Sequence, residues 1–103
     1  SAAHITGGGL IENITRSTPD NYTVNLDLSQ IKIKKIFKWI KSKNISDLEM
    51  LKTFNCGVGF CIIVDANDVN KIKKKFSKKY MPYEIGFISK GNEKLKLFNK
   101  LKW

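Results

Sequence analysis

The sequence predicts an α+β fold, in which a mixed β-sheet packs against helices. Three observations lead to this prediction. Residues 22–28 alternate apolar and polar side chains with a period of two, which is typical of a β-strand with one buried face. Apolar side chains within residues 33–40 recur at the spacing of an amphipathic helix. The run GVGFCIIV at residues 57–64 is apolar without alternation, which predicts a central strand covered on both faces.

The length of 103 residues fits one domain with a modest core, because a chain of this size buries only about two-thirds of its unfolded surface. The sequence begins Ser-Ala-Ala without a methionine, and we expect residues 1–103 to be a single partial domain of a longer protein. No apolar run approaches the roughly 20 residues of a membrane span, so no membrane partner is expected.

The first helix is predicted directly after three consecutive glycines. Leu10, Ile11 and Ile14 place apolar side chains along one side of it. We expect this helix to end near residues 17–19, because the residue before Pro19 is disfavoured in the helical region.

Two helices are predicted between the first two strands. The first covers residues 32–43, with its apolar stripe turned inward and Lys34, Lys35, Lys38 and Lys41 outside. The second is shorter and opens with a capping box. In that motif the side chains of Ser46 and Glu49 satisfy each other's backbone amides.

The rest of the chain predicts one helix and two strands. Asn67 and Asp68 are expected to cap a helix. Its apolar stripe is Val69, Ile72, Phe76 and Tyr80, and its last turns hold Lys73, Lys74, Lys75, Lys78 and Lys79, which complement the helix dipole. Residues 83–88 and 95–98 are predicted strands, separated by a turn at Gly91-Asn92. From residue 22 onward the order is therefore β-α-α-β-α-β-β.

The formal net charge of +10 ordinarily indicates an anionic partner such as nucleic acid or a membrane surface. Of the 19 basic residues, however, Arg16 is the single arginine. Proteins that clamp phosphates or read nucleic-acid grooves favour arginine for its bidentate guanidinium group. We therefore interpret the lysines as solvated surface and predict no nucleic-acid partner.

The two cysteines, Cys56 and Cys61, lie five positions apart in the predicted central strand, so their side chains are expected on opposite faces. A disulfide between them is then excluded, and with no C-x-x-C spacing and one histidine no metal site is predicted. Cys56 has no basic or histidine neighbour in sequence, which indicates a small buried residue rather than a nucleophile. A reducing cytoplasm is the expected compartment.

The run HITGGGLIEN contains the first candidate site. Gly7, Gly8 and Gly9 lead straight into a helix, and such a turn presents unpaired amides at the positive end of the helix dipole, where a phosphate binds well. Thr6 adds a hydroxyl and His4 an imidazole at the same rim. The run lacks the lysine of a P-loop and is not a G-x-G-x-x-G, so a plain tight turn with a structural histidine is the alternative.

Asn55 is a second candidate position, because it stands where a helix is predicted to end and the apolar strand to begin. Gly57 and Gly59 leave one face of that strand bare, so a ligand or another backbone has room to approach. Packing between the helix and the strand explains the same residues equally well.

A basic α+β module that binds RNA is an alternative from another class of protein. The run CGVGFCII is superficially similar to the glycine–aromatic core of an RNA-recognition strand. It lacks the second and third stacking aromatics, and the basic residues lie on predicted helices rather than beside that strand.

Two long motifs resemble the C-terminal part of the aminoimidazole ribonucleotide synthetase family, the phosphoribosylformylglycinamidine cyclo-ligases. They are H-I-T-G-G-G-L-I-E-N-I-x-R and E-M-x-x-T-F-N-C-G-V-G, with P-D and I-F-x-W-I between them. The resemblance extends from His4 to about Ile88. Thr15 stands where the family has the proline of E-N-I-P-R, and the lysine-rich tail after Gly91 has no counterpart.

This resemblance implies an enzyme of de novo purine synthesis that uses ATP and Mg²⁺ to close formylglycinamidine ribonucleotide into aminoimidazole ribonucleotide. It also implies the second half of that enzyme's C-terminal domain. His4 is then the candidate catalytic residue, which handles a proton or polarises the formyl group. Thr6 and the three glycines become candidates for holding phosphate oxygens. Further motif positions that are candidates for substrate or phosphate binding are Asn13, Arg16 and Asn55, and Glu12 matches the motif without an assigned role.

Members of that family carry an N-terminal domain with most of the nucleotide and metal ligands. We therefore expect that domain to bind ATP and Mg²⁺ and this chain alone to be inactive. Apolar surface that faces the rest of the enzyme is expected to be exposed, and a homodimer is the expected assembly. Sister enzymes of the superfamily are the nearer alternative: formylglycinamidine ribonucleotide synthetase, selenophosphate synthetase and thiamine-phosphate kinase. Those usually place an aspartate soon after the histidine, where this chain has Ile5-Thr6.

Overall fold

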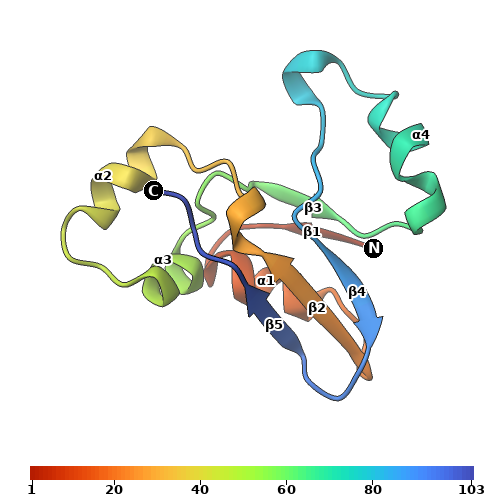
Figure 1. Cartoon of the computed structure of the whole chain (residues 1–103), viewed down its shortest axis with the longest axis horizontal. Helices are drawn as coiled ribbons and strands as arrows, with labels where there is room; N and C mark the ends of the chain where they lie inside the picture. The colour runs from red at the N-terminus through yellow and green to blue at the C-terminus, as the bar shows by residue number, and fades with distance from the viewer.

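The computed structural model describes all 103 residues and has two small sheets with short helices beside them (Figure 1). The elements in chain order are β1 (Ala2–His4), α1 (Gly9–Arg16), β2 (Tyr22–Asp27), α2 (Lys35–Lys41), α3 (Asp47–Thr53), β3 (Phe60–Ile62), α4 (Val69–Lys73), β4 (Gly86–Lys90) and β5 (Leu95–Phe98). Single 3-10 turns cover Leu28–Gln30, Ala66–Asp68 and Lys78–Tyr80. The predicted α+β class is confirmed.

The larger sheet is mixed and has the strand order β4-β2-β5. Its central strand β2 runs antiparallel to β4, with Val24 opposite Ile88, and parallel to β5, with Val24 also opposite Leu95. The smaller sheet is an antiparallel ribbon of β1 and β3, in which His4 faces Phe60. Figure 1 shows this ribbon crossing behind the larger sheet, with α2 and α3 on one side and α4 in a separate segment between β3 and β4.

The core lies where α1, α3 and the central strand β2 supply fully buried side chains. Leu10 of α1, Leu26 of β2, and Met50 and Leu51 of α3 are at most 1% exposed. Full burial of such a side chain stabilises a fold by about 1.5–3 kcal/mol. This core fixes the start of α1 against the end of α3, which decides the geometry of the glycine turn.

The predictions for α1, β2 and α3 agree with the structure in their bounds. Ser46 caps α3, since its hydroxyl accepts a hydrogen bond from the amide of Glu49 at 3.2 Å. The second half of the predicted capping box is wrong, because the carboxylate of Glu49 accepts from the hydroxyl of Thr53 at 3.4 Å instead. Strand β2 is buried on both faces rather than one, since Thr23 and Asn25 are as buried as Val24 and Leu26. The polar positions of the alternating pattern are side chains that form hydrogen bonds inside the protein.

The prediction of a central strand over residues 57–64 is wrong. Only Phe60–Ile62 form β3, which pairs with β1 alone, and Phe60 is 61% exposed. Cys56 lies outside the strand in a turn, with a positive φ of 54°. An apolar run predicts burial only where neighbouring elements cover it, and in these 103 residues β3 has a neighbour on one edge only.

The two lysine-rich helices are shorter than predicted. Helix α2 starts at Lys35 and buries no residue, and Ile36 and Trp39 are more than half exposed. Helix α4 ends at Lys73, and its predicted stripe residues Phe76 and Tyr80 are exposed. Neighbouring lysines repel one another at helical spacing, and no acidic residue stands among them to offset this. The 3-10 turn before α4 is capped by Asp65, not by Asn67 or Asp68, since its carboxylate accepts from the amide of Asn67 at 2.8 Å.

Two strands near the ends of the chain differ from the prediction in different ways. Strand β4 begins at Gly86, three residues later than predicted, whereas β5 has the predicted bounds. Strand β1 was not predicted, because three residues are too few to show an alternation.

Candidate functional site

The structure brings the two sequence motifs together at one end of the β1–β3 ribbon. The glycine turn, residues 6–9, lies beside the Asn55 turn, residues 54–59. Two backbone hydrogen bonds join the flanks of these turns: the amide of Ile5 donates to Gly59 at 3.0 Å, and that of Leu10 to Phe54 at 3.2 Å. Segments about 50 residues apart in the chain therefore form one surface.

The structural requirement for glycine differs among these three positions. Gly8 and Gly9 have φ values of +92° and +69°, a region that other residues rarely adopt. A Cβ on Gly9 would also meet the backbone of Leu51 and would lie 2.6 Å from the carbonyl carbon of Lys52, because α1 starts directly against α3. A Cβ on Gly7 would meet no atom within 4 Å. Nothing within the chain therefore requires a glycine at position 7.

The backbone amides at the start of α1 are partly used within the chain. The amide of Gly9 donates to the carbonyl of Thr6 at 3.1 Å, and that of Leu10 is bound to Phe54. The amides of Gly7 and Gly8 have no hydrogen-bond acceptor in the chain. Two N–H groups of this turn are therefore left without an acceptor in the chain, fewer than the run of three glycines suggests.

His4 and Thr6 border the glycine turn with exposed side chains. His4 ends β1 opposite Phe60, and the centroids of their two rings are 6.3 Å apart. The side chains of His4 and Thr6 form no hydrogen bond within the chain. The imidazole thus has the ring of Phe60 as a neighbour but no hydrogen bond within the chain that would mark it as a structural histidine.

Asn13 is buried beneath the turn rather than exposed beside it, with 7% of its surface accessible. Its side-chain amide donates to the carbonyls of Gly9 at 2.7 Å and Gly7 at 3.1 Å, with a longer contact to Thr6 at 3.5 Å. The side chain predicted to contact substrate therefore contacts the turn from its inner side.

Arg16 is in the last turn of α1, and Glu12 lies between it and the glycines. Arg16 is seven positions after Gly9, which is about 10 Å along the helix axis. The two side chains form an exposed ion pair, and the carboxylate of Glu12 occupies the space beside Gly8 where a Cβ would stand. Sequence reasoning assigned no role to Glu12, although its position in the first turn of the helix was a signal that it lies next to the amides.

Asn55 shapes its own turn. Its side-chain oxygen accepts from the amide of Gly57 at 2.9 Å, and its carbonyl accepts from that of Val58 at 2.8 Å. This is the hydrogen-bonding pattern of an Asx turn. Gly57 adopts a φ of +106°, and a Cβ there would lie 2.9 Å from the carbonyl of Lys32. The packing explanation for this junction therefore accounts for Asn55 and Gly57.

Cys56 and Cys61 are both buried and free. Burial raises the pKa of each thiol to about 11, and the charge of Asp47 contributes at Cys56. The thiols are therefore protonated near neutral pH. The prediction that Cys56 is a small buried residue rather than a nucleophile agrees with this environment.

These two thiols predict a loss of stability in alkali. An unfolded thiol ionises near pH 9 and the folded one near 11, so the stabilisation is complete below pH 9 and is lost as pH rises through 11. The free energy of unfolding is expected to fall by at most about 1.4 kcal/mol per pH unit for each thiol. Urea unfolding at pH 8, 9 and 10 measures this fall. A chain with Cys56→Ala and Cys61→Ala should lose most of the slope, and an unchanged slope would assign it to other groups.

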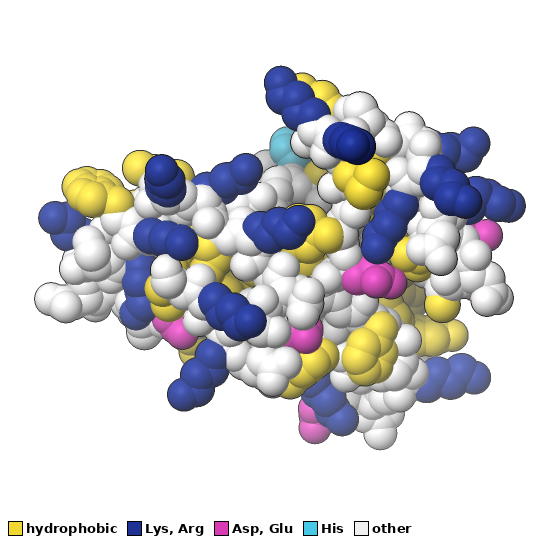
Figure 2. All heavy atoms as spheres, turned by 45° about the horizontal axis from the view of Figure 1, so that its top comes forward, with side chains coloured by type: hydrophobic (Ala, Val, Ile, Leu, Met, Phe, Trp, Pro, Cys, Tyr) yellow, Lys and Arg dark blue, Asp and Glu magenta, His cyan; other side chains and the backbone are white.

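The positive charge is spread rather than concentrated. Figure 2 shows Lys and Arg side chains scattered over the visible face among hydrophobic side chains. Four lysines lie over aromatic rings of the chain itself: Lys32 over Tyr83, Lys41 over Trp103, Lys43 over Trp39 and Lys79 over Tyr80. No three His, Cys, Asp or Glu side chains meet in a group able to hold a metal ion. None of the helices has both the length and the hydrophobicity that crossing a membrane requires.

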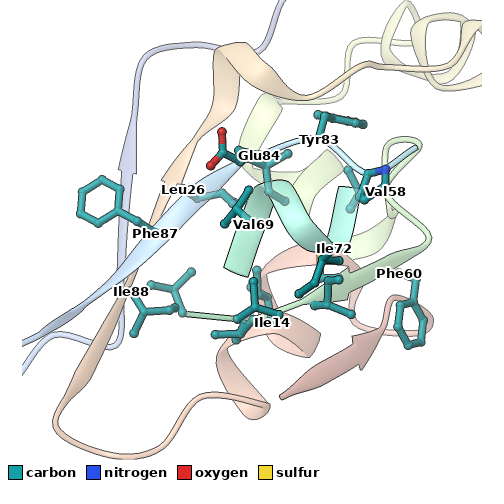
Figure 3. Close-up of a pocket in the computed structure, with 18 of the residues that line it drawn as sticks. Ile14, Leu26, Val58, Phe60, Val69, Ile72, Tyr83, Glu84, Phe87 and Ile88 are labelled. Carbon is teal, nitrogen blue, oxygen red and sulfur yellow. The ribbon is translucent and has the colours of Figure 1, made fainter. Parts of the chain in front are cut away.

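An apolar cavity of about 420 Å³ lies between the larger sheet, β3 and the segment that contains α4 (Figure 3). Ile14, Leu26, Val69, Ile72 and Ile88 line it from four different elements. The cavity reaches the Asn55 turn but contains none of the candidate residues around the glycine turn. The cavity therefore lies beside the candidate residues of the glycine turn and does not include them.

Comparison with known proteins gives one family and a consistent set of relatives. The family model for "AIR synthase related protein, C-terminal domain" matches residues 1–97. The "Trifunctional purine biosynthetic protein adenosine-3" of Gallus gallus is 42% identical over 103 residues, which cover 96% of this chain and 10% of that protein. The "Phosphoribosylformylglycinamidine cyclo-ligase" of Staphylococcus saprophyticus is 41% identical (91% of this chain, 28% of the relative), and that of Neisseria gonorrhoeae is 39% identical (88% and 28%). The chain thus spans about a tenth to just over a quarter of these relatives.

Proposed function

Since this chain belongs to the family of AIR synthase related proteins, C-terminal domain, we propose that it is part of a phosphoribosylformylglycinamidine cyclo-ligase of purine biosynthesis. The observation that carries the proposal is the glycine turn, in which the amides of Gly7 and Gly8 are unpartnered at the start of α1 and Gly7 has open space above it. Such a group of amides suits a phosphate. The relatives named above are cyclo-ligases or trifunctional purine biosynthetic proteins, which supports this reading over the sister enzymes and over an RNA-binding module.

In the proposed reaction, ATP phosphorylates the formyl oxygen of formylglycinamidine ribonucleotide. The amidine nitrogen then attacks the activated carbon, and phosphate leaves as the imidazole ring of aminoimidazole ribonucleotide closes. Positioning and charge stabilisation supply most of the catalysis in phosphoryl transfer. The contribution of this chain is to hold phosphate oxygens on the amides of Gly7 and Gly8, with the hydroxyl of Thr6 at the rim.

His4 is the proposed proton-handling group. Its exposed imidazole ends β1 immediately before the glycine turn and has no hydrogen-bond partner in the chain. A neutral imidazole carries one nitrogen that donates a hydrogen bond and one that accepts, so the side chain offers both groups to a substrate. We propose that His4 polarises or protonates a group on a substrate whose phosphate lies on the neighbouring amides.

The residues present do not provide a ligand set for Mg²⁺. Magnesium in nucleotide sites is usually held by one or two carboxylates together with substrate phosphates, and the carboxylate beside the glycine turn, that of Glu12, is paired with Arg16. We therefore assign Mg²⁺ and most contacts to ATP to parts of the protein outside these 103 residues, and we expect the chain alone to show no turnover.

The exposed apolar surface supports the proposal that other protein covers this chain. Phe60, Trp39 and Tyr80 are each more than 60% exposed, which is unusual for aromatic side chains of a monomeric protein. We propose a homodimer of the complete enzyme. We also propose that this enzyme is located in the cytoplasm, because free cysteines are typical of a reducing compartment and purine synthesis is compatible with it.

A chimeric enzyme tests the proposed function. Residues 1–97 replace the matching region of the Staphylococcus saprophyticus cyclo-ligase, and formation of aminoimidazole ribonucleotide from its precursor and ATP is measured. We expect activity in the chimera and none in the 103-residue chain alone. A folded chimera without activity, while the parent enzyme is active, would contradict the proposal, as would turnover by the isolated chain.

The carboxylate of Glu12 predicts a measurable effect on anion binding. It lies beside Gly8, where its negative charge opposes a phosphate on the same amides. Glu12→Gln is expected to tighten the binding of inorganic phosphate about two- to fivefold, because a charge at a helix N-terminus is worth about 0.3–1 kcal/mol. NMR titration gives the affinity, and Glu93→Gln, which removes an exposed charge elsewhere, is the control. Equal affinities in all three chains would show that Glu12 does not face the anion.

A further inference from the structure

The contacts of Asn13 all lie on the inner side of the glycine turn. Its side-chain amide, the donor group, shares its two hydrogens among the carbonyls of Gly9, Gly7 and Thr6, at 2.7, 3.1 and 3.5 Å. The residue is 7% exposed, so no ligand in solvent reaches these hydrogens. One side chain thus contacts three carbonyls of the same glycine turn.

Because peptide groups are planar, these contacts also fix the direction in which the neighbouring amides point. All peptide bonds of the chain are trans, and in a trans peptide the N–H points opposite to the carbonyl of the preceding residue. The carbonyls of Thr6 and Gly7 point toward Asn13, so the amides of Gly7 and Gly8 point away from it.

The Gly9–Leu10 peptide shows the same relation, and in this case the amide has an acceptor within the chain. The carbonyl of Gly9 points toward Asn13, and the following amide, that of Leu10, points the other way and donates to Phe54. The amides of Gly7 and Gly8 are oriented by the same side chain and have no such acceptor.

We infer that Asn13 is a positioning residue, which sets the affinity of the glycine turn for phosphate by fixing two peptide planes without touching the anion. This inference rests on the proposed phosphate-binding function. It differs from the direct contact with substrate that the sequence suggested for Asn13. A side chain that orients amides in advance removes the cost of ordering them when the anion binds.

The variant Asn13→Asp tests the inference because it keeps the shape of the side chain and removes the donor. A carboxylate repels the three carbonyls, so the peptides are expected to turn. Asn25→Asp is the matched control: Asn25 is 8% exposed and also donates to three acceptors, two carbonyls and the hydroxyl of Ser89, but in the larger sheet. Asn13→Ala and Asn25→Ala form a second matched pair if either aspartate variant does not fold.

The readout is the NMR signal of the Gly7 and Gly8 amides in the 103-residue chain during titration with inorganic phosphate, together with thermal stability. Both variants are expected to lower the melting temperature. Asn13→Asp should also weaken the phosphate response of Gly7 and Gly8 at least tenfold, whereas Asn25→Asp should leave it at the wild-type value. A folded Asn13 variant with the wild-type response would overturn the inference.

A wild-type chain that does not respond to phosphate would contradict the proposed binding function. The positioning role of Asn13 is then tested by a separate measurement. In that case the backbone chemical shifts and amide exchange rates of residues 6–9 are compared between the chains. Changes confined to the Asn13 variants support the positioning role without the anion. Wild-type values in those variants would refute it.

Discussion

Replacing Gly9 with alanine is expected to destabilise the chain by about 3 kcal/mol, a large part of the stability of a small domain. Alanine at a φ of +69° is strained by about 1–2 kcal/mol. Its Cβ would also press on the backbone of Leu51 and Lys52, which adds about 1–3 kcal/mol of overpacking. Since that neighbour is backbone of α3, no side-chain rotation relieves the contact.

Gly7→Ala is the matched control for this prediction, because its Cβ would meet no atom and its φ is not positive. We expect its free energy of unfolding to stay within about 0.5 kcal/mol of the wild type. Urea denaturation of the three chains measures both values. Equal losses in the two variants would mean that the start of α1 does not pack against α3 as described.

Leu101→Ala is the second substitution with a large expected effect, about 2–4 kcal/mol of lost stability. Leu101 is 6% exposed and belongs to the core, although it lies in the lysine-rich tail after Gly91. No counterpart for this tail was expected from the sequence, but the family model matches it as far as residue 97. The tail is held at its end as well, since the indole of Trp103 donates to Asp47 at 2.8 Å and lies under the ammonium group of Lys41.

The control for the tail is Lys100→Ala, an exposed neighbour whose loss should change stability by less than about 0.5 kcal/mol. Thermal unfolding of the wild type and the two variants separates the effects. A tail that adds nothing to the fold would give both variants the same melting temperature as the wild type.

The predictable parts of the fold are those that depend on short-range chemistry. The cap of α3 by Ser46 and the end of α1 before Pro19 depend on residues within one turn of the helix, and both are found. The parts that depend on distant neighbours were not predictable. The residues of β3 are apolar enough for a central strand, but whether a strand is central depends on which elements flank it.

The candidate site shows the same division. The sequence did not predict that the glycine turn and the Asn55 turn lie together, which the hydrogen bonds from Ile5 and Leu10 show. It gave no information on which side of the turn each side chain lies. Asn13 is beneath the turn and Arg16 is distant along α1, because the helical position of a residue decides its side and its distance.

The most direct measurement for the account as a whole is the NMR response of individual backbone amides to inorganic phosphate. Saturable shifts at Gly7 and Gly8, with much smaller ones at the internally bonded amides of Gly9 and Leu10, are the expected result. A response spread over the lysine-bearing segments, or equal shifts at all four of these amides, would contradict a phosphate seat in the glycine turn.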